Sequence, residues 1–238
     1  TTCPLTPDAA RHLHANLATK SGFGGEIIAP LPAAERAFAA ARLMPLLRGL
    51  MSGRRVGHFA DDAGTLEFTG SRDFAKLAVV GTSCPDHFLR TKIAPLVLDP
   101  ARIDDSSYLA ERIEAYRADY AAYYHRCARP GSPAMRDPNP VVVLVPGIGR
   151  MTFAGDKTTA RLAGEFYANA INVMRGAEGI GAYVGLDEQE AFDIEYWLLE
   201  EAKPQRMPKP KPLAGRIALV TGGAGGIGAA TAERLAAD

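Results

Sequence analysis

Residues 216–228 read RIALVTGGAGGIG, and this stretch bears most directly on the fold. An apolar, β-branched run leads into a glycine-rich turn, after which a helix is expected over 227–237. Gly222 permits the tight turn, Gly226 lets the backbone approach a pyrophosphate, and Gly228 lets the helix pack closely on the strand. The N–H groups at the beginning of the helix would then face the phosphates. The pattern predicts a dinucleotide-binding strand–turn–helix whose cofactor-binding residues are Thr221, Gly222, Gly223, Gly226, Ile227 and Gly228.

A proline-rich connector precedes this motif. Four prolines lie within residues 204–212, where they cannot continue a helix and favour an extended segment. We therefore expect an α/β region over 1–203, a linker over 204–213, and a dinucleotide-binding domain over 214–238. One strand and one helix make only half of a βαβ unit, so we expect this domain to be truncated. The choice between NAD and NADP stays open, because the strand that determines it would follow.

Strand-like and helix-like segments alternate before the linker, which indicates the α/β class. Apolar residues recur at helical spacing in some segments, and short apolar runs typical of strands lie between them. The expected helices span 8–20, 32–50, 106–127, 158–178 and 187–203, and the expected strands span 56–59, 66–68, 77–81, 95–98, 141–145 and 150–153.

The composition excludes two classes of partner. The 27 basic residues equal the 27 acidic ones, so the chain has no electrostatic footprint for nucleic acid or for an anionic membrane surface. No apolar run approaches the roughly 18 residues that a membrane-spanning helix needs. Cys3, Cys84 and Cys127 lack metal-type spacing, and we expect them to be reduced thiols in a cytoplasmic protein.

One family resembles this chain over most of its length. The middle of the bifunctional rhamnulose-1-phosphate aldolase/short-chain dehydrogenases is similar to residues 81–92 (GTSCPDHFLRTK), 143–149 (VLVPGIG), 164–178 (GEFYANAINVMRGAE) and 194–215 (IEYWLLEEAKPQRMPKPKPLAG), which lead in order to the glycine motif. The resemblance implies an aldolase-like α/β region with a mixed sheet, followed by a truncated Rossmann strand–turn–helix.

The resemblance also implies a function. In that family a class II aldolase portion cleaves the sugar phosphate with a divalent metal, usually zinc, that polarises the carbonyl. The fused short-chain dehydrogenase oxidises the released lactaldehyde with NAD or NADP. The expected partners are therefore a sugar phosphate and an aldehyde, and the parent enzyme is expected to be a homo-oligomer. We expect this chain, as a fragment, to be inactive alone.

The histidines that hold the family's metal have no counterpart at two matching positions. A strand running into 82–85 resembles one that leads into a His-x-His-Pro pair, where this chain has Ser83 and Cys84. The loop 146–149 resembles one that carries His-Gly, with Ile148 at the ligand position. We therefore expect no metal in this chain and a zinc site elsewhere in the parent. Residues 1–203 are hypothesised to hold a second, metal-less copy of the aldolase fold, built on a central mixed sheet.

Three adjacent residues are weak catalytic candidates, the other catalytic residues being expected outside the chain. His87 and Asp86, with Arg90 and Lys92, would suit a phosphate or carboxylate near a helix. Cys84 would suit a metal ligand or a reactive thiol. The alternative is a structural turn at the beginning of a helix, and the sequence favours this alternative slightly.

Two further groups have simpler interpretations. Tyr116, Tyr120 and Tyr123 share one face of the expected helix over 106–127, which is typical of packing. Glu195 lies near Trp197, and we expect a solvated carboxylate beside an anchoring aromatic ring.

Three functional hypotheses remain open from the sequence. The chain is a fragment of the bifunctional enzyme, a non-catalytic module that scaffolds or oligomerises the parent, or a short-chain dehydrogenase with an unusual N-terminal extension. The first two are compatible, because a scaffolding segment can belong to a catalytic parent.

Overall fold

The computed structural model describes residues 11–12, 15, 22–82, 84–199 and 211–237. The helix expected over 8–20 lies largely outside this description. None of the described helices combines the length and the apolar character that crossing a membrane requires.

A four-stranded mixed sheet forms the centre of the fold, which confirms the α/β class. Its order is β1 (Val56–Ala60), β4 (Gly149–Ala154), β3 (Val142–Val145) and β2 (Leu96–Val97). β1 and β3 run antiparallel to β4, whereas β2 runs parallel to β3. The four strands coincide closely with the expected segments 56–59, 150–153, 141–145 and 95–98.

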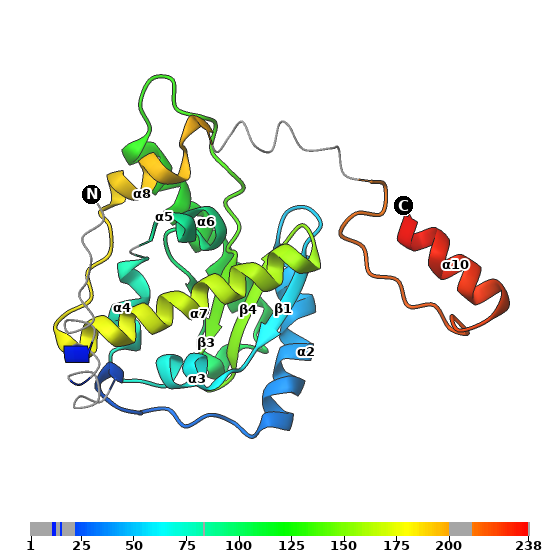
Figure 1. The fold of residues 1–238 in the computed structure, drawn as a ribbon, viewed down its shortest axis with the longest axis horizontal. Coiled ribbons are helices and arrows are strands. Elements are labelled where there is room, and N and C mark those ends of the chain that lie inside the picture. Colours follow the sequence, from blue (N-terminus) through cyan, green and yellow to red (C-terminus); the bar gives the residue numbers. More distant parts are fainter. Residues whose placement is uncertain (1–10, 13–14, 16–21, 83, 200–210, 238) are drawn as a thin grey trace.

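Helices cover both faces of this sheet because its middle strands are apolar on both sides. Val143 and Val145 of β3 belong to a core cluster with α2 (Ala33–Leu50) and α6 (Ser106–Cys127). Val142 and Leu144 belong to the opposite cluster, with α7 (Lys157–Ile180). The period-two alternation of a strand thus divides one apolar run between two cores. Figure 1 shows α7 lying across the sheet.

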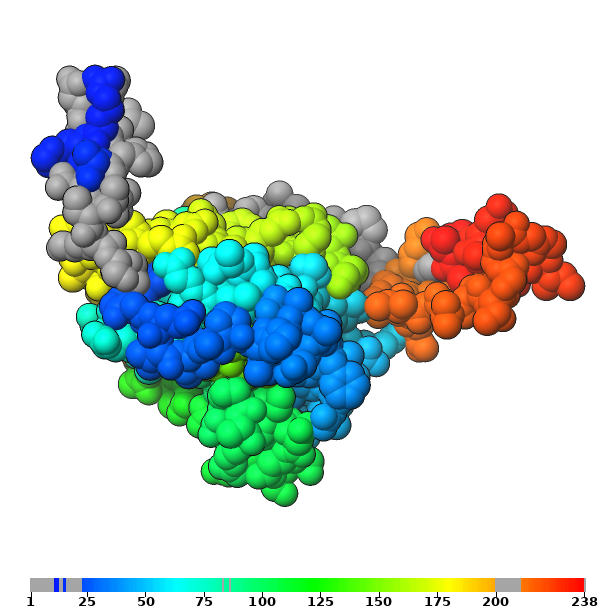
Figure 2. Space-filling view, turned by 90° about the horizontal axis from the view of Figure 1, so that it is seen from below, coloured from blue at the N-terminus to red at the C-terminus, as the bar shows by residue number. Residues whose placement is uncertain are grey.

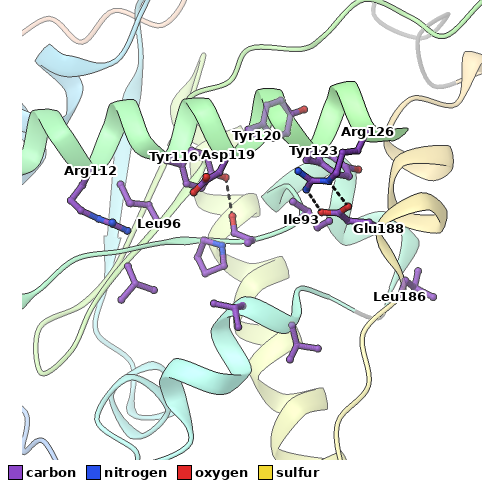
Figure 3. A pocket seen from close by; sticks show the side chains of 15 residues that line it. Ile93, Leu96, Arg112, Tyr116, Asp119, Tyr120, Tyr123, Arg126, Leu186 and Glu188 are labelled. Atoms are coloured by element: carbon purple, nitrogen blue, oxygen red, sulfur yellow. Dashed lines mark hydrogen bonds and ion pairs between the residues drawn. The ribbon is translucent and has the colours of Figure 1, made fainter. Parts of the chain in front are cut away.

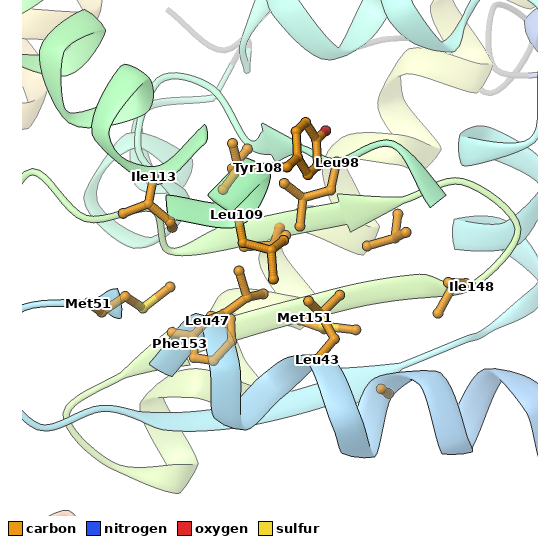
Figure 4. Packing of buried hydrophobic residues seen from close by; sticks show 14 residues of the cluster. Leu43, Leu47, Met51, Leu98, Tyr108, Leu109, Ile113, Ile148, Met151 and Phe153 are labelled. Atoms are coloured by element: carbon orange, nitrogen blue, oxygen red, sulfur yellow. The ribbon is translucent and has the colours of Figure 1, made fainter. Parts of the chain in front are cut away.

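The core between the sheet, α2 and α6 is the more extensive of the two. Figure 4 shows Leu43 and Leu47 of α2 packing towards Met151 and Phe153 of β4, with Leu109 of α6 nearby. Leu47 has no exposed surface. The helix α2 continues through Pro45, so the proline does not end it as it ends many helices.

Aspartates cap the beginnings of several helices. Asp105 accepts a 3.0 Å hydrogen bond from the backbone N–H of Tyr108 at the start of α6. Asp156 accepts one of 2.8 Å from Thr159 at the start of α7. The short helix α8 (Glu188–Glu195) is capped by Asp187 in the same way. Such caps satisfy N–H groups that have no partner within the helix.

Two expected strands are helices. Residues 66–68 belong to α3 (Ala63–Thr69), which Asp62 caps, and residues 77–81 overlap α4 (Phe74–Val80). In α4, Phe74, Leu77 and Ala78 are buried while Val79 is 75% exposed. This is the i, i+3, i+4 spacing of a one-sided helix, and the apolar run was too short to distinguish it from a buried strand.

Two other expectations need correction in length or pairing. The helix expected over 187–203 is interrupted: α8 ends at Glu195, residues 198–199 are helical again, and 200–203 lie outside the described residues. The strand expected over 216–220 is not formed: these residues have no regular secondary structure and pair with no strand in the described part of the chain. A strand needs such a neighbour for its backbone hydrogen bonds. The helix that follows, α10 (Gly226–Ala237), begins near the expected residue, and Figure 2 shows 211–237 projecting to one side of the body.

Candidate functional site

A buried group of polar side chains joins α6 to α8. Glu195 is only 1% exposed. Tyr120 donates a 2.6 Å hydrogen bond to Glu195 Oε1, and Tyr123 donates one of 3.2 Å to Oε2. The hydroxyl of Tyr196 lies 2.7 Å from that of Tyr120. We call these four residues, together with Lys92, the tyrosine–glutamate cluster.

Lys92 supplies the cation of this cluster. It follows α5 (Pro85–Thr91) with a φ of 62°, in the left-handed region that non-glycine residues rarely adopt. Its Nζ lies 3.7 Å from the centre of the Tyr120 ring and donates to the backbone oxygen of Asp137. Burial lowers the pKa of Lys92 to about 7, although Glu195 acts to raise it.

Burial acts on the acid of the cluster as well. It raises the pKa of Glu195, and the hydrogen bond from Tyr120 and the charge of Lys92 oppose this effect. The pKa of Tyr120 is raised first by burial and then by Glu195. Desolvation therefore pushes the Lys92–Glu195 pair towards its neutral forms. A lysine that exchanges its proton near neutral pH has the property of a general acid or base.

A cavity of about 400 Å³ lies beside the cluster (Figure 3). Tyr120 and Tyr123 line it from α6, and Ile93 and Leu96 line it from the segment that follows α5. Tyr116 is held in the same wall because its hydroxyl donates a 2.8 Å hydrogen bond to the backbone oxygen of Ala94. The cavity thus combines apolar walls with a few polar groups, as small-molecule sites do.

Charged side chains lie at both ends of this cavity. Figure 3 shows Arg112 on one side of the cavity and the pair formed by Arg126 and Glu188 on the other. Arg126 Nε donates a 3.0 Å hydrogen bond to Glu188 Oε2, which ties α6 to the beginning of α8. The exposure of both side chains makes this pair a weak contributor to stability.

The three catalytic candidates from the sequence lie at the beginning of α5. Cys84 is the N-cap residue and is partly exposed, and Asp86 lies in the first turn. His87 is buried at 2% exposure, and its ring packs edge-on against Phe166 of α7 at 5.5 Å between centroids. The position of His87 is one of helix packing, whereas Lys92, at the other end of α5, belongs to the cluster.

The described residues contain no group of three or more histidine, cysteine or acidic side chains arranged to hold a metal ion. Ile148, at the ligand position of the resembling loop, is 1% exposed and belongs to the core against α2. The segment before 82–85 is the helix α4 and not the expected strand. His58 contacts Lys157, whose Nζ lies 3.3 Å from His58 Nδ1, and burial followed by this charge lowers the pKa of His58.

The glycine motif forms the turn and the helix of the expected strand–turn–helix, but not its strand. Gly222 and Gly226 have φ values of 69° and 50°, in the left-handed region where glycine carries no penalty. A Cβ at Gly228 would lie 2.2 Å from the carbonyl oxygen of Gly222, so the turn closes directly on the helix. Ile227 is 87% exposed and Leu219 is 93% exposed.

Comparison with known families assigns the body of the fold. Residues 38–203 match the model of the second domain of class II aldolases. The chain belongs to this family. The match contains the whole sheet and the tyrosine–glutamate cluster, and it ends just before the proline-rich segment 204–213. The cluster and both walls of the cavity beside it are therefore parts of the class II aldolase second domain.

A relative carries this second domain within a longer protein. The chain is 34% identical to the protein named uncharacterized oxidoreductase YuxG from Bacillus subtilis (strain 168), over 244 aligned positions. The alignment covers 100% of this chain and 35% of that relative, so the chain spans about a third of its length. No solved structure matches the chain.

The sequence interpretation was wrong about Glu195 and Trp197. Glu195 is buried instead of solvated, and Trp197 is 53% exposed instead of anchored. The sequence did contain a signal, because Glu195 lies three and four positions after Phe192 and Ala191, which are buried on the same face of α8. The shared face of Tyr120 and Tyr123 was expected to pack, and it does, but it also binds Glu195.

Proposed function

We propose that this chain belongs to a bifunctional enzyme that cleaves rhamnulose 1-phosphate and oxidises the released lactaldehyde with NAD or NADP. In this proposal residues 1–203 form the class II aldolase part, 204–213 a linker and 214–238 the beginning of a short-chain dehydrogenase domain. The observation that carries it is the order within one chain: an aldolase second domain, then a glycine turn at the beginning of a helix. The oxidoreductase name of the relative agrees with this order.

The residues of the glycine turn fit a dinucleotide. The left-handed Gly222 and Gly226 and the close approach of Gly228 to Gly222 leave backbone N–H groups at the beginning of α10 without side chains in front of them. Thr221 and Ile227 flank the turn and would contact the cofactor. A bound nicotinamide dinucleotide supplies a hydride acceptor. The contribution of these residues is to bind and orient its diphosphate.

The described residues do not fit a catalytic metal, since they contain no suitable group of ligands. We therefore assign the metal-dependent cleavage, with zinc as the expected ion, to ligands outside the described residues. The second domain would instead shape the enzyme around that site. This role also accommodates the alternative that the domain is a non-catalytic scaffold, because the tyrosine–glutamate cluster holds α8 against α6.

The test uses the whole protein that contains this chain. Rhamnulose 1-phosphate should yield dihydroxyacetone phosphate and lactaldehyde, and lactaldehyde should reduce NAD or NADP, measured at 340 nm. A chelator should abolish only the cleavage. Gly228→Val should abolish only the oxidation, because its side chain would meet the Gly222 carbonyl. Absence of both activities in the whole protein would refute the proposal. Oxidation that survives in Gly228→Val would refute the role given to the turn.

A further inference from the structure

The cavity of Figure 3 lies at an edge of the sheet. β2 stands at one end of the strand order, where it pairs with β3. The consecutive residues 93–97, which include the whole of β2, line the cavity. Its other walls are the face of α6 that carries Tyr116 and Tyr120 and the end of α4 with Val79 and Val80. One edge strand and two helices therefore enclose this space.

The two helices cover opposite faces of the sheet. Leu109 of α6 belongs to the same core cluster as Val143 of β3, and Leu77 of α4 belongs to the opposite cluster with Val142. A space beside an edge strand, between the layers that cover the two faces, is the place that one more strand would take. The cavity touches both helices and β2, so it occupies that place.

The backbone of Val97 is directed into the cavity. The N–H of Leu98 donates a 3.0 Å hydrogen bond to the carbonyl oxygen of Leu144, the residue of β3 that lies opposite Val97. Successive residues of a strand direct their backbone groups to opposite edges, so the N–H and C=O of Val97 face away from β3. Another extended chain would supply the partners that these groups require.

The walls around this edge are apolar. Val79 ends a helix whose inner side is buried, yet its own side chain is 75% exposed at the cavity. Ile93 and Leu186 continue the apolar lining. Native proteins usually cover or charge an exposed apolar surface beside a free strand edge. The walls therefore favour a ligand whose side chains are apolar.

Two unpaired charges limit the length of that ligand. Arg112 and Asp119 line the cavity from α6, and neither forms an ion pair with another residue that the structure describes. They are seven positions apart, which places them on one side of α6 about 10.5 Å apart along its axis. A fully extended peptide of three residues spans about 10 Å. Its carboxylate and its ammonium group would match the two charges.

The order of contacts along α6 gives the direction of such a peptide. The hydroxyl of Tyr108 accepts a 2.8 Å hydrogen bond from the N–H of Asp99, and that of Tyr116 donates one to the oxygen of Ala94. α6 therefore runs against the direction of the segment that contains β2. Arg112 lies between these tyrosines, towards the C-terminal end of β2. A peptide whose carboxylate binds there would run parallel to β2.

We propose that the cavity of Figure 3 binds a short apolar peptide with free termini, which adds a parallel strand to the edge of β2. The N–H and C=O of Val97 pair with the peptide backbone, Arg112 binds its carboxylate and Asp119 binds its ammonium group. The cavity volume of about 400 Å³ lies within the range for ligand sites. The site shares no residue with the glycine turn and requires neither reaction of the proposed enzyme.

Isothermal titration calorimetry with this chain tests the ligand at constant ionic strength. The probes are trivaline, its C-terminal amide and triglycine. We expect trivaline to bind saturably and its amide to bind about tenfold more weakly, because the amide has no charge for Arg112. Triglycine should not bind, because it has no side chains for the apolar walls. No saturable binding of trivaline up to about 10 mM, or equal binding of trivaline and its amide, would overturn the proposal.

Variants of Val97 test the pairing with β2. Val97→Pro removes the N–H that faces the cavity and leaves the bonds between β2 and β3, since an edge strand accepts proline on its outer side. We expect it to abolish trivaline binding, whereas Val97→Ala, the matched control, keeps the N–H and should bind within about threefold of the wild type. Urea denaturation checks that both variants are folded. Equal binding by the two variants would contradict the pairing.

Arginine variants test the carboxylate contact without changing the strand. In Arg112→Gln, amidation of trivaline should no longer weaken binding. In Arg126→Gln, the matched control, the effect of amidation should persist, because Glu188 already pairs with Arg126. An amidation effect that survives in Arg112→Gln would contradict the place given to the carboxylate.

Sedimentation velocity distinguishes the peptide from a second copy of the chain at the same edge. We expect any self-association of the chain to be the same in the wild type and in Val97→Pro. A dimer that Val97→Pro dissociates would assign this edge to the second copy and would overturn the peptide proposal.

Discussion

The hydroxyl of Tyr120 lies 2.6 Å from a carboxylate oxygen of Glu195, while Lys92 lies over the face of the same tyrosine ring. One aromatic side chain therefore contacts both members of a buried acid–base pair. The hydroxyl of Tyr120 donates a hydrogen bond to Glu195, and the electron-rich face of its ring attracts the ammonium group of Lys92. Each contact favours the charged form of one member and opposes the effect of burial on it. Each side chain can be tested separately.

Tyr120→Phe should destabilise the domain while it keeps the ring. The variant leaves Glu195 with one donor fewer and removes one of the two hydrogen-bond partners of the Tyr196 hydroxyl, both in a buried site. We expect a loss of about 1–3 kcal/mol in the free energy of unfolding, measured by urea denaturation. Tyr124→Phe is the matched control, because it removes a partly buried bond to the backbone of Pro133 and should have the smaller effect. Equal losses would contradict the importance of the cluster.

Lys92 should titrate near neutral pH. Its pKa is lowered to about 7 by burial, so its side-chain NMR signals should shift around that pH and not near the usual value of about 10.4. Lys92→Met assigns the signal by removing it. Glu195→Gln should move the titration to still lower pH, because the carboxylate is what raises the pKa of Lys92. An unchanged midpoint in Glu195→Gln would exclude the electrostatic link between the two residues.

The stability of the fold should depend on pH through the same lysine. Lys92 releases its proton at a pH of about 7 when folded and at about 10.4 when unfolded. The unfolded chain therefore binds more protons between these values, so this residue makes the free energy of unfolding rise with pH over that window. Below pH 7 Lys92 is protonated in both states, and the burial of its charge then lowers the free energy of unfolding by the full amount. In Lys92→Met the rise should be smaller than in the wild type, measured by urea denaturation from pH 7 to 9.5. An identical slope would contradict the lowered pKa.

Substitutions on the buried face of α2 should destabilise the core of Figure 4 more than substitutions on its exposed face. Leu47→Ala removes a side chain with no exposed surface and should cost about 2–5 kcal/mol of unfolding free energy. Leu46→Ala, one position earlier, removes a side chain that is 43% exposed and should cost much less. Thermal and urea unfolding measure both. Similar losses in the two variants would mean that α2 faces the core with a different side than the structure shows.

Much of the fold was predictable because its signals are local. The helix expected over 106–127 coincides with α6, since its apolar spacing lies within the segment and its capping aspartate, Asp105, directly precedes it. The run over 141–145 was recognisable as a buried strand for the same reason. Residues 77–81 were assigned wrongly because five apolar residues have no unambiguous period. Only the packing of Leu77 and Ala78 on one side reveals the helix.

The candidate site was less predictable because its members are distant in the sequence. Lys92 was grouped with the residues near His87, and Glu195 was assigned to a solvated face. Nothing local indicates that a tyrosine on α6 would connect them. Charged residues are rarely buried unless they are paired, so the sequence favoured an exposed Glu195. The glycine turn, by contrast, was predictable because a tight turn requires backbone angles that glycine adopts easily. The left-handed conformation of Gly222 agrees with that expectation.

The pairing of β1 with β4 has a consequence for the order of folding. Val56 is opposite Ala154, so the two strands meet across roughly a hundred positions of chain. During synthesis β1 leaves the ribosome long before its partner exists, and it must wait with an unpaired edge until β4 follows. We therefore expect the nascent chain to remain vulnerable to proteases until residue 154 has emerged, and to become resistant within a narrow range of lengths.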